Sequence, residues 1–249
     1  MKDVKILHAP SAAEPFVVIY KPRGLPSAPL KQSETENALF KTAQIFPEIL
    51  RVSGRKEIEC GLLHRLDTAT EGLLLLATNQ VWYEKLLDAQ KSGLFKKEYY
   101  AKCFKKISIN DSEGFPPLPR DLFDNAKMLQ PPYTLESYFR AYGKGARLVR
   151  PVTIDSGKTI LKKSNKRLYK TTIQSLEKAD NDFYLVKVSL ENGFRHQVRA
   201  HLAWLGFPIV GDELYGAKGE QFCFSATKIT FPSFTDEKKY TFSIEADFL

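Results

Sequence analysis

The stretch that decides the fold is IECGLLHRLDTATEGLLLLA, residues 58–77. It predicts two apolar strands, 58–67 and 72–77, separated by the polar letters TATE. Asp67 ends the first strand, where a carboxylate stays ionised only if something solvates it. An arginine is its natural partner, because a guanidinium holds a carboxylate charged and oriented. The alternative is that Asp67 caps the turn TATEG, a common role of aspartate.

Positive charge is concentrated in one segment of the chain. Residues 144–170 contain nine Lys or Arg and one Asp, an excess of eight that equals the net charge of +8. A smaller excess lies in 91–106, with six Lys and one Glu. Such a concentration is typical of a protein that binds a polyanion, most often nucleic acid. The alternative is a solvated loop that has no partner.

Composition excludes several classes of protein. A chain of 249 residues with 43% hydrophobic content can bury a core, so it is not disordered. The longest apolar run, 73–77, is far shorter than the roughly 20 residues of a membrane span, and the N-terminus lacks the apolar region of a signal peptide. We therefore expect a cytoplasmic protein. The odd number of cysteines predicts thiols, not disulfides, at Cys60, Cys103 and Cys223.

Strand-like runs with few helices predict an α+β fold built on a largely antiparallel mixed sheet flanked by helices. No linker divides the chain, so we expect a single domain over 1–249. Helices are expected at 80–93 and 194–208. Further strands are expected at 16–20, 97–104, 137–142, 146–152, 169–176, 182–190, 222–231 and 239–246.

The expected helix 194–208 carries two arginines. Its apolar stripe is formed by Val198, Leu202 and Leu205. Gly206 stands where a C-terminal cap belongs. Arg195 and Arg199 are four residues apart, so they are expected to emerge on one helix face.

Neither a metal nor a cofactor is expected. Cys60 and His64 stand in a Cys-x3-His spacing, but no second ligand pair accompanies them. The sequence has no glycine-rich phosphate loop and no Gly-x-Ser-x-Gly elbow.

Four segments in order resemble the motifs of the RluA-type RNA pseudouridine synthases. VVIYKPRGLP, 17–26, looks like the opening strand followed by Lys-Pro-x-Gly, and HRLDTATEGLLLLAT, 64–78, contains HRLD unchanged. KKEYYAKC, 96–103, matches Lys-x-Tyr-x-Ala. ENGFRHQVRAHLAWLGFPIVGDELYG, 191–216, is similar to the last motif. The resemblance covers most of the chain and implies a single pseudouridine synthase catalytic domain with a central active-site cleft.

The chain departs from the family pattern at three places. Phe194 stands where the last motif has an arginine, and Arg195 stands at the place of its threonine. The segment 104–190 shows no family motif. The first motif begins at residue 17, so we expect no separate S4-type RNA-binding module.

The resemblance also implies a mechanism that needs no cofactor or metal, in which uracil is detached from C1′, rotated and rejoined through carbon. Asp67 is then the essential catalytic carboxylate, as nucleophile or electrostatic stabiliser. Tyr99 lies against the uracil, or is a core aromatic residue. Arg199 is the expected salt-bridge partner of Asp67. His64 and His196 are expected to be structural, with their ring nitrogens bonded to nearby backbone.

Other basic residues are expected to contact RNA. Arg65 probes the base stack or a phosphate after the target uridine is flipped. Arg195 is a second candidate partner for Asp67, or a phosphate contact. Lys21 touches phosphate or buttresses its turn. The basic stretch is expected to hold the RNA backbone through Lys162, Lys163, Lys166 and Arg167.

The predicted function is isomerisation of specific uridines in rRNA or tRNA, with RNA as the partner and no obligate protein partner. An alternative, for which Phe194 gives room, is a catalytically inactive RNA-binding protein of the same fold. A nucleoside hydrolase using Asp67 ranks last, because no second carboxylate accompanies it.

Overall fold

The structure is a computed structural model that describes residues 3–31, 33–106, 114–118, 131–179, 182–216 and 221–248. The backbone divides into two compact units. Unit 1 comprises the chain up to Lys97 together with Ser225–Asp247, and unit 2 comprises Glu98–Phe224. The single domain expected over 1–249 stays a prediction.

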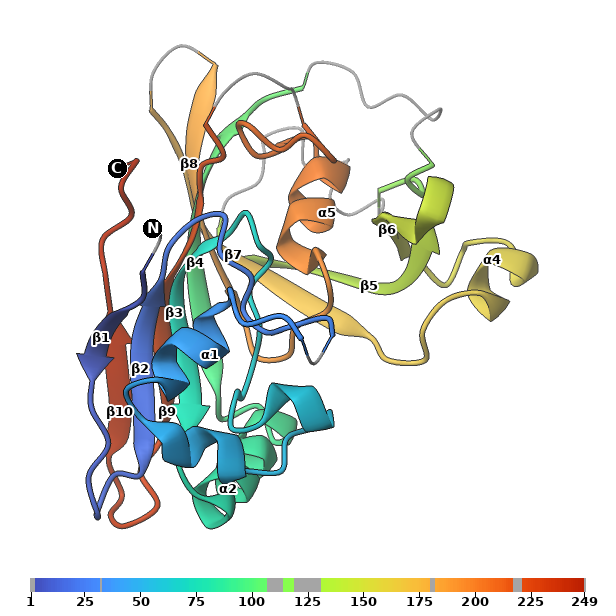
Figure 1. Cartoon of the computed structure of the whole chain (residues 1–249). Helices are drawn as coiled ribbons and strands as arrows, with labels where there is room; N and C mark the ends of the chain where they lie inside the picture. Colours follow the sequence, from blue (N-terminus) through green and yellow to red (C-terminus); the bar gives the residue numbers. More distant parts are fainter. Residues whose placement is uncertain are drawn as a thin grey trace. The chain divides into compact units, whose positions relative to one another are not determined.

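Unit 1 is built on five strands that are drawn in blue, cyan and red in Figure 1. They follow the order β1-β2-β3-β9, with β10 pairing β9, and only the β3–β9 pair is parallel. The helices α1 (Ala38–Ala43) and α2 (Gln80–Lys91) complete the unit, with 3-10 turns at Pro47–Arg51 and Glu57–Glu59. The strands are β1 (Lys5–His8), β2 (Phe16–Lys21), β3 (Glu71–Ala77), β9 (Phe224–Pro232) and β10 (Lys239–Ser243).

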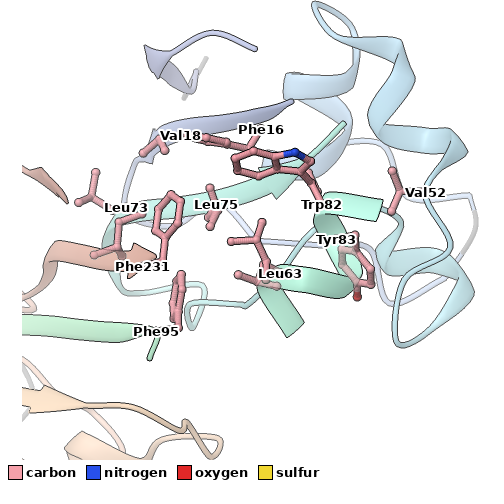
Figure 2. Close-up of a cluster of buried hydrophobic side chains, with 13 residues drawn as sticks. Phe16, Val18, Val52, Leu63, Leu73, Leu75, Trp82, Tyr83, Phe95 and Phe231 are labelled. Carbon is pink, nitrogen blue, oxygen red and sulfur yellow. The ribbon is translucent and has the colours of Figure 1, made fainter. Parts of the chain in front are cut away.

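One cluster of buried hydrophobic side chains in unit 1 lies between this sheet and α2 (Figure 2). Strand β3 is buried along its whole length, as its continuous apolar run predicts. Side chains from β2, β3, α2 and β9 form one cluster, in which the Phe16 and Trp82 ring centroids are 5.4 Å apart. Helix α2 begins where the Asn79 side chain accepts a hydrogen bond from the Trp82 N–H, which confirms the expected helix at 80–93 to within two residues.

The expected strand 58–67 is wrong. This segment contains a 3-10 turn and only an isolated bridge, Leu62 to Leu76. Cys60 has a φ of 44°, a left-handed conformation that interrupts an extended chain. At Gly61 a Cβ atom would lie 2.1 Å from the Ala77 carbonyl oxygen, so only glycine permits this close approach to β3. The residues from 60 to 70 therefore form a loop packed along β3.

In the part of unit 2 that the structure describes, five strands follow the order β4-β8-β7-β5-β6. The printed pairs β7–β8, β5–β7 and β5–β6 are antiparallel. Among its described residues, the helices are α4 (Lys158–Lys162) and α5 (Gln197–Trp204), with a 3-10 turn at Lys144–Ala146. The strands are β4 (Lys96–Phe104, from Glu98 on in this unit), β5 (Tyr133–Tyr142), β6 (Leu148–Val152), β7 (Tyr169–Lys178) and β8 (Phe183–Leu190). The expected α+β class with a largely antiparallel mixed sheet is confirmed.

Helix α5 is shorter than the expected 194–208. It begins at Gln197, because His196 before it takes a left-handed conformation with φ 56°. Arg195 therefore lies outside the helix, and its expected place on one face with Arg199 is wrong. The expected C-terminal cap is confirmed, since Gly206 has a φ of 87° directly after the last turn.

The described ranges bear on two further expectations, the lack of a membrane span and the state of the cysteines. No helix in those ranges is both long and apolar enough to cross a bilayer. The three cysteines are free thiols, with Cys103 and Cys223 buried and Cys60 half-buried.

Candidate active site

One serine fixes the backbone of Leu66, the residue that precedes Asp67. Ser27, which is buried, donates from Oγ to the Leu66 carbonyl oxygen at 2.8 Å and accepts from the Leu66 N–H at 2.9 Å. The Asp67 carbonyl oxygen in turn accepts from the Thr70 N–H at 3.0 Å. The half-buried Asp67 therefore follows a residue, Leu66, whose N–H and carbonyl groups are both hydrogen-bonded.

The Lys-Pro-x-Gly turn after β2 holds the same loop from the other side. The Gly24 N–H donates to the Thr68 carbonyl oxygen at 2.7 Å. Lys21 is fully buried, and its Nζ donates to the carbonyl oxygens of Leu25 at 2.7 Å, Pro22 at 3.1 Å and Thr68 at 3.4 Å. Of the two roles expected for Lys21, buttressing the turn fits this burial, whereas a phosphate contact needs an accessible ammonium group.

An ion pair joins this turn to a buried carboxylate. Arg23 Nη2 is 2.9 Å from Oε1 of Glu71, whose side chain is buried at the start of β3. Burial and the nearby Glu71 carboxylate raise the pKa of Tyr20 to about 12, so its hydroxyl stays neutral. Sequence reasoning gave neither Arg23 nor Glu71 a role, although both stand inside the matched motifs.

Arg65 precedes the Asp67 turn and is half exposed. Its Nη1 lies 3.1 Å from Oε1 of Glu59, an ion pair with a side chain that is nearly buried. An exposed guanidinium with one carboxylate partner can still exchange that partner for a phosphate. The expected RNA contact of Arg65 stays a prediction.

His64 is buried and neutral. Burial, with the positive charges of Lys97 and Arg55 nearby, lowers its pKa well below 6.5. Neither ring nitrogen has a hydrogen-bond partner among the described residues, so the expected bonds to backbone are wrong. The same surroundings lower the pKa of the buried Lys97 to about 8, chiefly through loss of solvation.

Tyr99 lies on β4 in unit 2, on the buried side of the strand. Its ring stacks on Phe224 with centroids 5.2 Å apart and planes inclined by 14°. One face of Tyr99 is thus covered by an aromatic ring. This burial fits both expected roles, against a uracil or within the core, so the active-site role of Tyr99 stays a prediction.

Arg199 on α5 has a carboxylate partner that the sequence analysis missed. Its Nε donates to Oδ2 of Asp212 at 2.8 Å and its Nη2 donates to Oδ1 at 2.7 Å, and both side chains are buried. The signal for Asp212 was the GDELYG segment that closes the last motif. Asp67 belongs to unit 1 and Arg199 to unit 2, so the expected pair of these two stays a prediction.

Phe194 and Arg195 occupy two different environments. Phe194, which replaces the family arginine, stacks on Phe139 with ring centroids 5.1 Å apart and packs against a buried cluster of unit 2. The exposed Arg195 donates from Nη2 to the carbonyl oxygens of Ala146 at 2.6 Å and Leu148 at 3.3 Å. His196 lies 3.0 Å through Nδ1 from the Tyr215 hydroxyl, which fits its expected structural role.

The basic stretch presents its charges to solvent. Helix α4 and the segment after it carry the four side chains that were expected to hold RNA backbone, and all four are exposed. Within the described ranges none of them lies in an ion pair with a carboxylate. Uncompensated cations of this kind can neutralise phosphates. They are Lys162, Lys163, Lys166 and Arg167.

The described residues contain no group of three or more His, Cys, Asp or Glu side chains arranged to hold a metal ion.

Comparison with known proteins assigns the chain to a family. The family model described as RNA pseudouridylate synthase matches residues 15–204. This span holds both the Asp67 loop and Arg199. The chain therefore belongs to the RNA pseudouridylate synthase family, as the motifs around Asp67 predict.

Two curated relatives are 31% and 27% identical to this chain over the aligned segments. A ribosomal large subunit pseudouridine synthase C of Rickettsia felis is 31% identical over 169 residues, which is 68% of this chain and 46% of the relative. An uncharacterized RNA pseudouridine synthase of Bacillus subtilis, YlyB, is 27% identical over 202 residues, 81% of this chain and 55% of the relative. The chain thus spans about half the length of these relatives.

Two solved structures share the fold. Human RNA Pseudouridylate Synthase Domain Containing 1 superposes with a TM-score of 0.65 at 18% identity, covering 100% of this chain and 85% of that one. Human RNA Pseudouridylate Synthase Domain Containing 4 has a TM-score of 0.61 at 17% identity, covering 97% and 88%.

Proposed function

We propose that this protein converts specific uridines of ribosomal or transfer RNA to pseudouridine, with Asp67 as the essential carboxylate. The observation that carries the proposal is the fixed backbone on either side of Asp67. Ser27 bonds both backbone groups of Leu66, and Lys21 and Gly24 bond the carbonyl oxygen of Thr68. Two sequence segments that match separate family motifs thus combine to position one carboxylate, as a preorganised catalytic group requires.

The reaction balances without an added reagent. The bond between C1′ and N1 of uridine breaks, a bond between C1′ and C5 forms, C5 loses its proton, and N1 gains one. Asp67 supplies the negative charge that attacks or stabilises the electron-poor centre while the base is detached. Arg199 is the proposed partner that keeps this carboxylate ionised, and Tyr99 the proposed ring against the uracil.

The exposed basic residues of α4 and its neighbours would hold the RNA backbone during this chemistry. Such contacts position the RNA without reading its sequence. The name of the Rickettsia felis relative supports large-subunit ribosomal RNA as the substrate to test first. The free thiols of Cys60, Cys103 and Cys223 support a reducing, cytoplasmic site of action.

A second candidate is an RNA-binding protein without catalytic activity. The observation that favours it is Phe194, which packs on Phe139 where the family motif has an arginine. The presence of Asp67, Tyr99 and Arg199 supports the catalytic proposal instead, because RNA binding alone requires none of this set.

The test uses RNA transcripts labelled with tritium at C5 of uridine, since C5 must lose its hydrogen when it bonds C1′. Wild type is expected to release tritium to water, and Asp67→Asn is expected to release none while binding the RNA with unchanged affinity. Asp88→Asn is the matched control, because this exposed carboxylate on α2 pairs with Lys91 at the surface. Equal release by Asp67→Asn and wild type would refute the proposal.

A further inference from the structure

The Arg199 guanidinium is held on one edge and against two rings. Asp212 accepts two parallel hydrogen bonds, from Nε at 2.8 Å and from Nη2 at 2.7 Å. The ring centroids of Tyr215 and Phe222 lie 5.3 Å and 5.2 Å from Cζ of Arg199. A planar cation bound at one edge and in contact with two aromatic rings has little rotational freedom left.

Asp212 is itself fixed by its own turn. Its Oδ1 also accepts from the N–H groups of Leu214 at 3.0 Å and Tyr215 at 3.2 Å. Its carbonyl oxygen accepts from the Gly216 N–H at 2.7 Å. At Gly216 a Cβ would lie 2.6 Å from the Ile209 carbonyl oxygen, so the GDELYG turn closes only with glycine there. The carboxylate therefore forms a rigid support for the arginine.

Tyr215 is anchored as firmly as the carboxylate. Its hydroxyl oxygen accepts from the Val149 N–H on β6 at 2.9 Å and lies 3.0 Å from Nδ1 of His196. Burial raises the pKa of Tyr215 to about 12, so the phenol stays neutral and the ring keeps its place beside the cation. The support of Arg199 thus extends from the turn into the sheet of unit 2.

Asp212 binds the guanidinium along a single edge. A guanidinium has five N–H donors, and Asp212 uses the edge formed by Nε and Nη2. The Nη1 donors are not part of this bidentate pair. A carboxylate that fixes one edge of an arginine fixes the direction of the remaining donors as well.

We propose that Asp212 is a positioning residue of the pseudouridylation reaction and acts through Arg199. By holding the guanidinium in one orientation, it supports the role proposed above for Arg199. This inference rests on the proposed function. A misplacement of about 1 Å in a positioned group costs roughly a hundredfold in rate, so the effect is expected in the chemical step and not in RNA affinity.

The experiment measures the single-turnover rate of tritium release from labelled large-subunit rRNA transcripts, with RNA affinity and the melting temperature measured in parallel. Asp212→Asn is expected to lower the rate about a hundredfold and to change RNA affinity by less than about threefold. Asp212→Glu keeps the charge but adds a methylene group, and is expected to lose about tenfold in rate. In the background Arg199→Lys, Asp212→Asn should cause little further loss, because coupled residues are not additive.

Ser137→Ala is the control for stability alone. It removes the buried 2.8 Å hydrogen bond to Nε2 of His201, another residue of α5, without touching Arg199. A rate loss in Asp212→Glu that exceeds that of an equally destabilised Ser137→Ala supports the inference. Equal rates for Asp212→Glu, Asp212→Asn and wild type would overturn this inference and leave the proposed function in place. If wild type itself releases no tritium, the proposed function fails and this inference fails with it.

Discussion

Replacing Ser27 by alanine removes both hydrogen bonds that fix the residue before Asp67. The Leu66 N–H and carbonyl groups bond Ser27 Oγ at 2.9 Å and 2.8 Å, and both residues are buried. Each backbone group left buried without a partner costs about 1–3 kcal/mol. For two groups in a loop that can relax in part, we expect a loss of about 2–4 kcal/mol in the free energy of unfolding. The Asp67 turn should shift as well, so the reaction rate should fall.

Urea unfolding measures this loss as a lower midpoint with an unchanged slope. Ser233→Ala is the matched control, since Ser233 Oγ accepts from the Thr235 N–H at 3.3 Å in an exposed loop of the same unit. The control is expected to stay within about 0.5 kcal/mol of wild type. If Ser27→Ala unfolds as wild type does, the backbone of the Asp67 loop is held by something other than this serine, and the reasoning is refuted.

Two further predictions concern charge. Wild-type RNA affinity should fall with added salt, and neutralising the basic stretch should flatten the slope of log affinity against log salt by about three; an unchanged slope would remove that surface from the interface. Lys97 has a pKa of about 8 in the folded protein and 10.5 as its ordinary value, so the unfolded chain binds more protons between these limits. Stability should therefore rise with pH from 8 to 10.5 in wild type relative to Lys97→Met; a pH-independent difference between the two would contradict the lowered pKa. The changes that neutralise the basic stretch in the salt experiment are Lys162→Gln, Lys163→Gln, Lys166→Gln and Arg167→Gln.

The sequence predicted the strands that consist of continuous runs of apolar residues. Residues 16–20 and 72–77 are strands because their β-branched and leucine side chains are buried in a sheet. The segment 58–67 has a similar composition but is a loop, because Cys60 takes a positive φ and Gly61 packs against a backbone oxygen. Hydrophobic composition does not distinguish a buried loop from a buried strand.

The sequence predicted the motif residues of the candidate site, but it predicted their geometry less well. The place of Asp67 followed from HRLD, but the bonds that hold its loop come from Ser27 and Lys21, about 40 residues earlier in the chain. Arg195 was misplaced because helical spacing was assumed through His196, which takes a left-handed conformation. Asp212 was missed because a carboxylate in a turn looks like a turn former until its bidentate partner is seen.

The central claim is that Asp67 carries the chemistry, and pseudouridine mapping in cells tests it most directly. Total RNA from cells with and without the gene is labelled with carbodiimide and mapped by primer extension. The deletion strain is complemented with wild type, Asp67→Asn or Asp88→Asn. The account predicts a pseudouridine that disappears with the gene and returns with wild type and Asp88→Asn only. Its return with Asp67→Asn, at the level that wild type restores, would contradict the account.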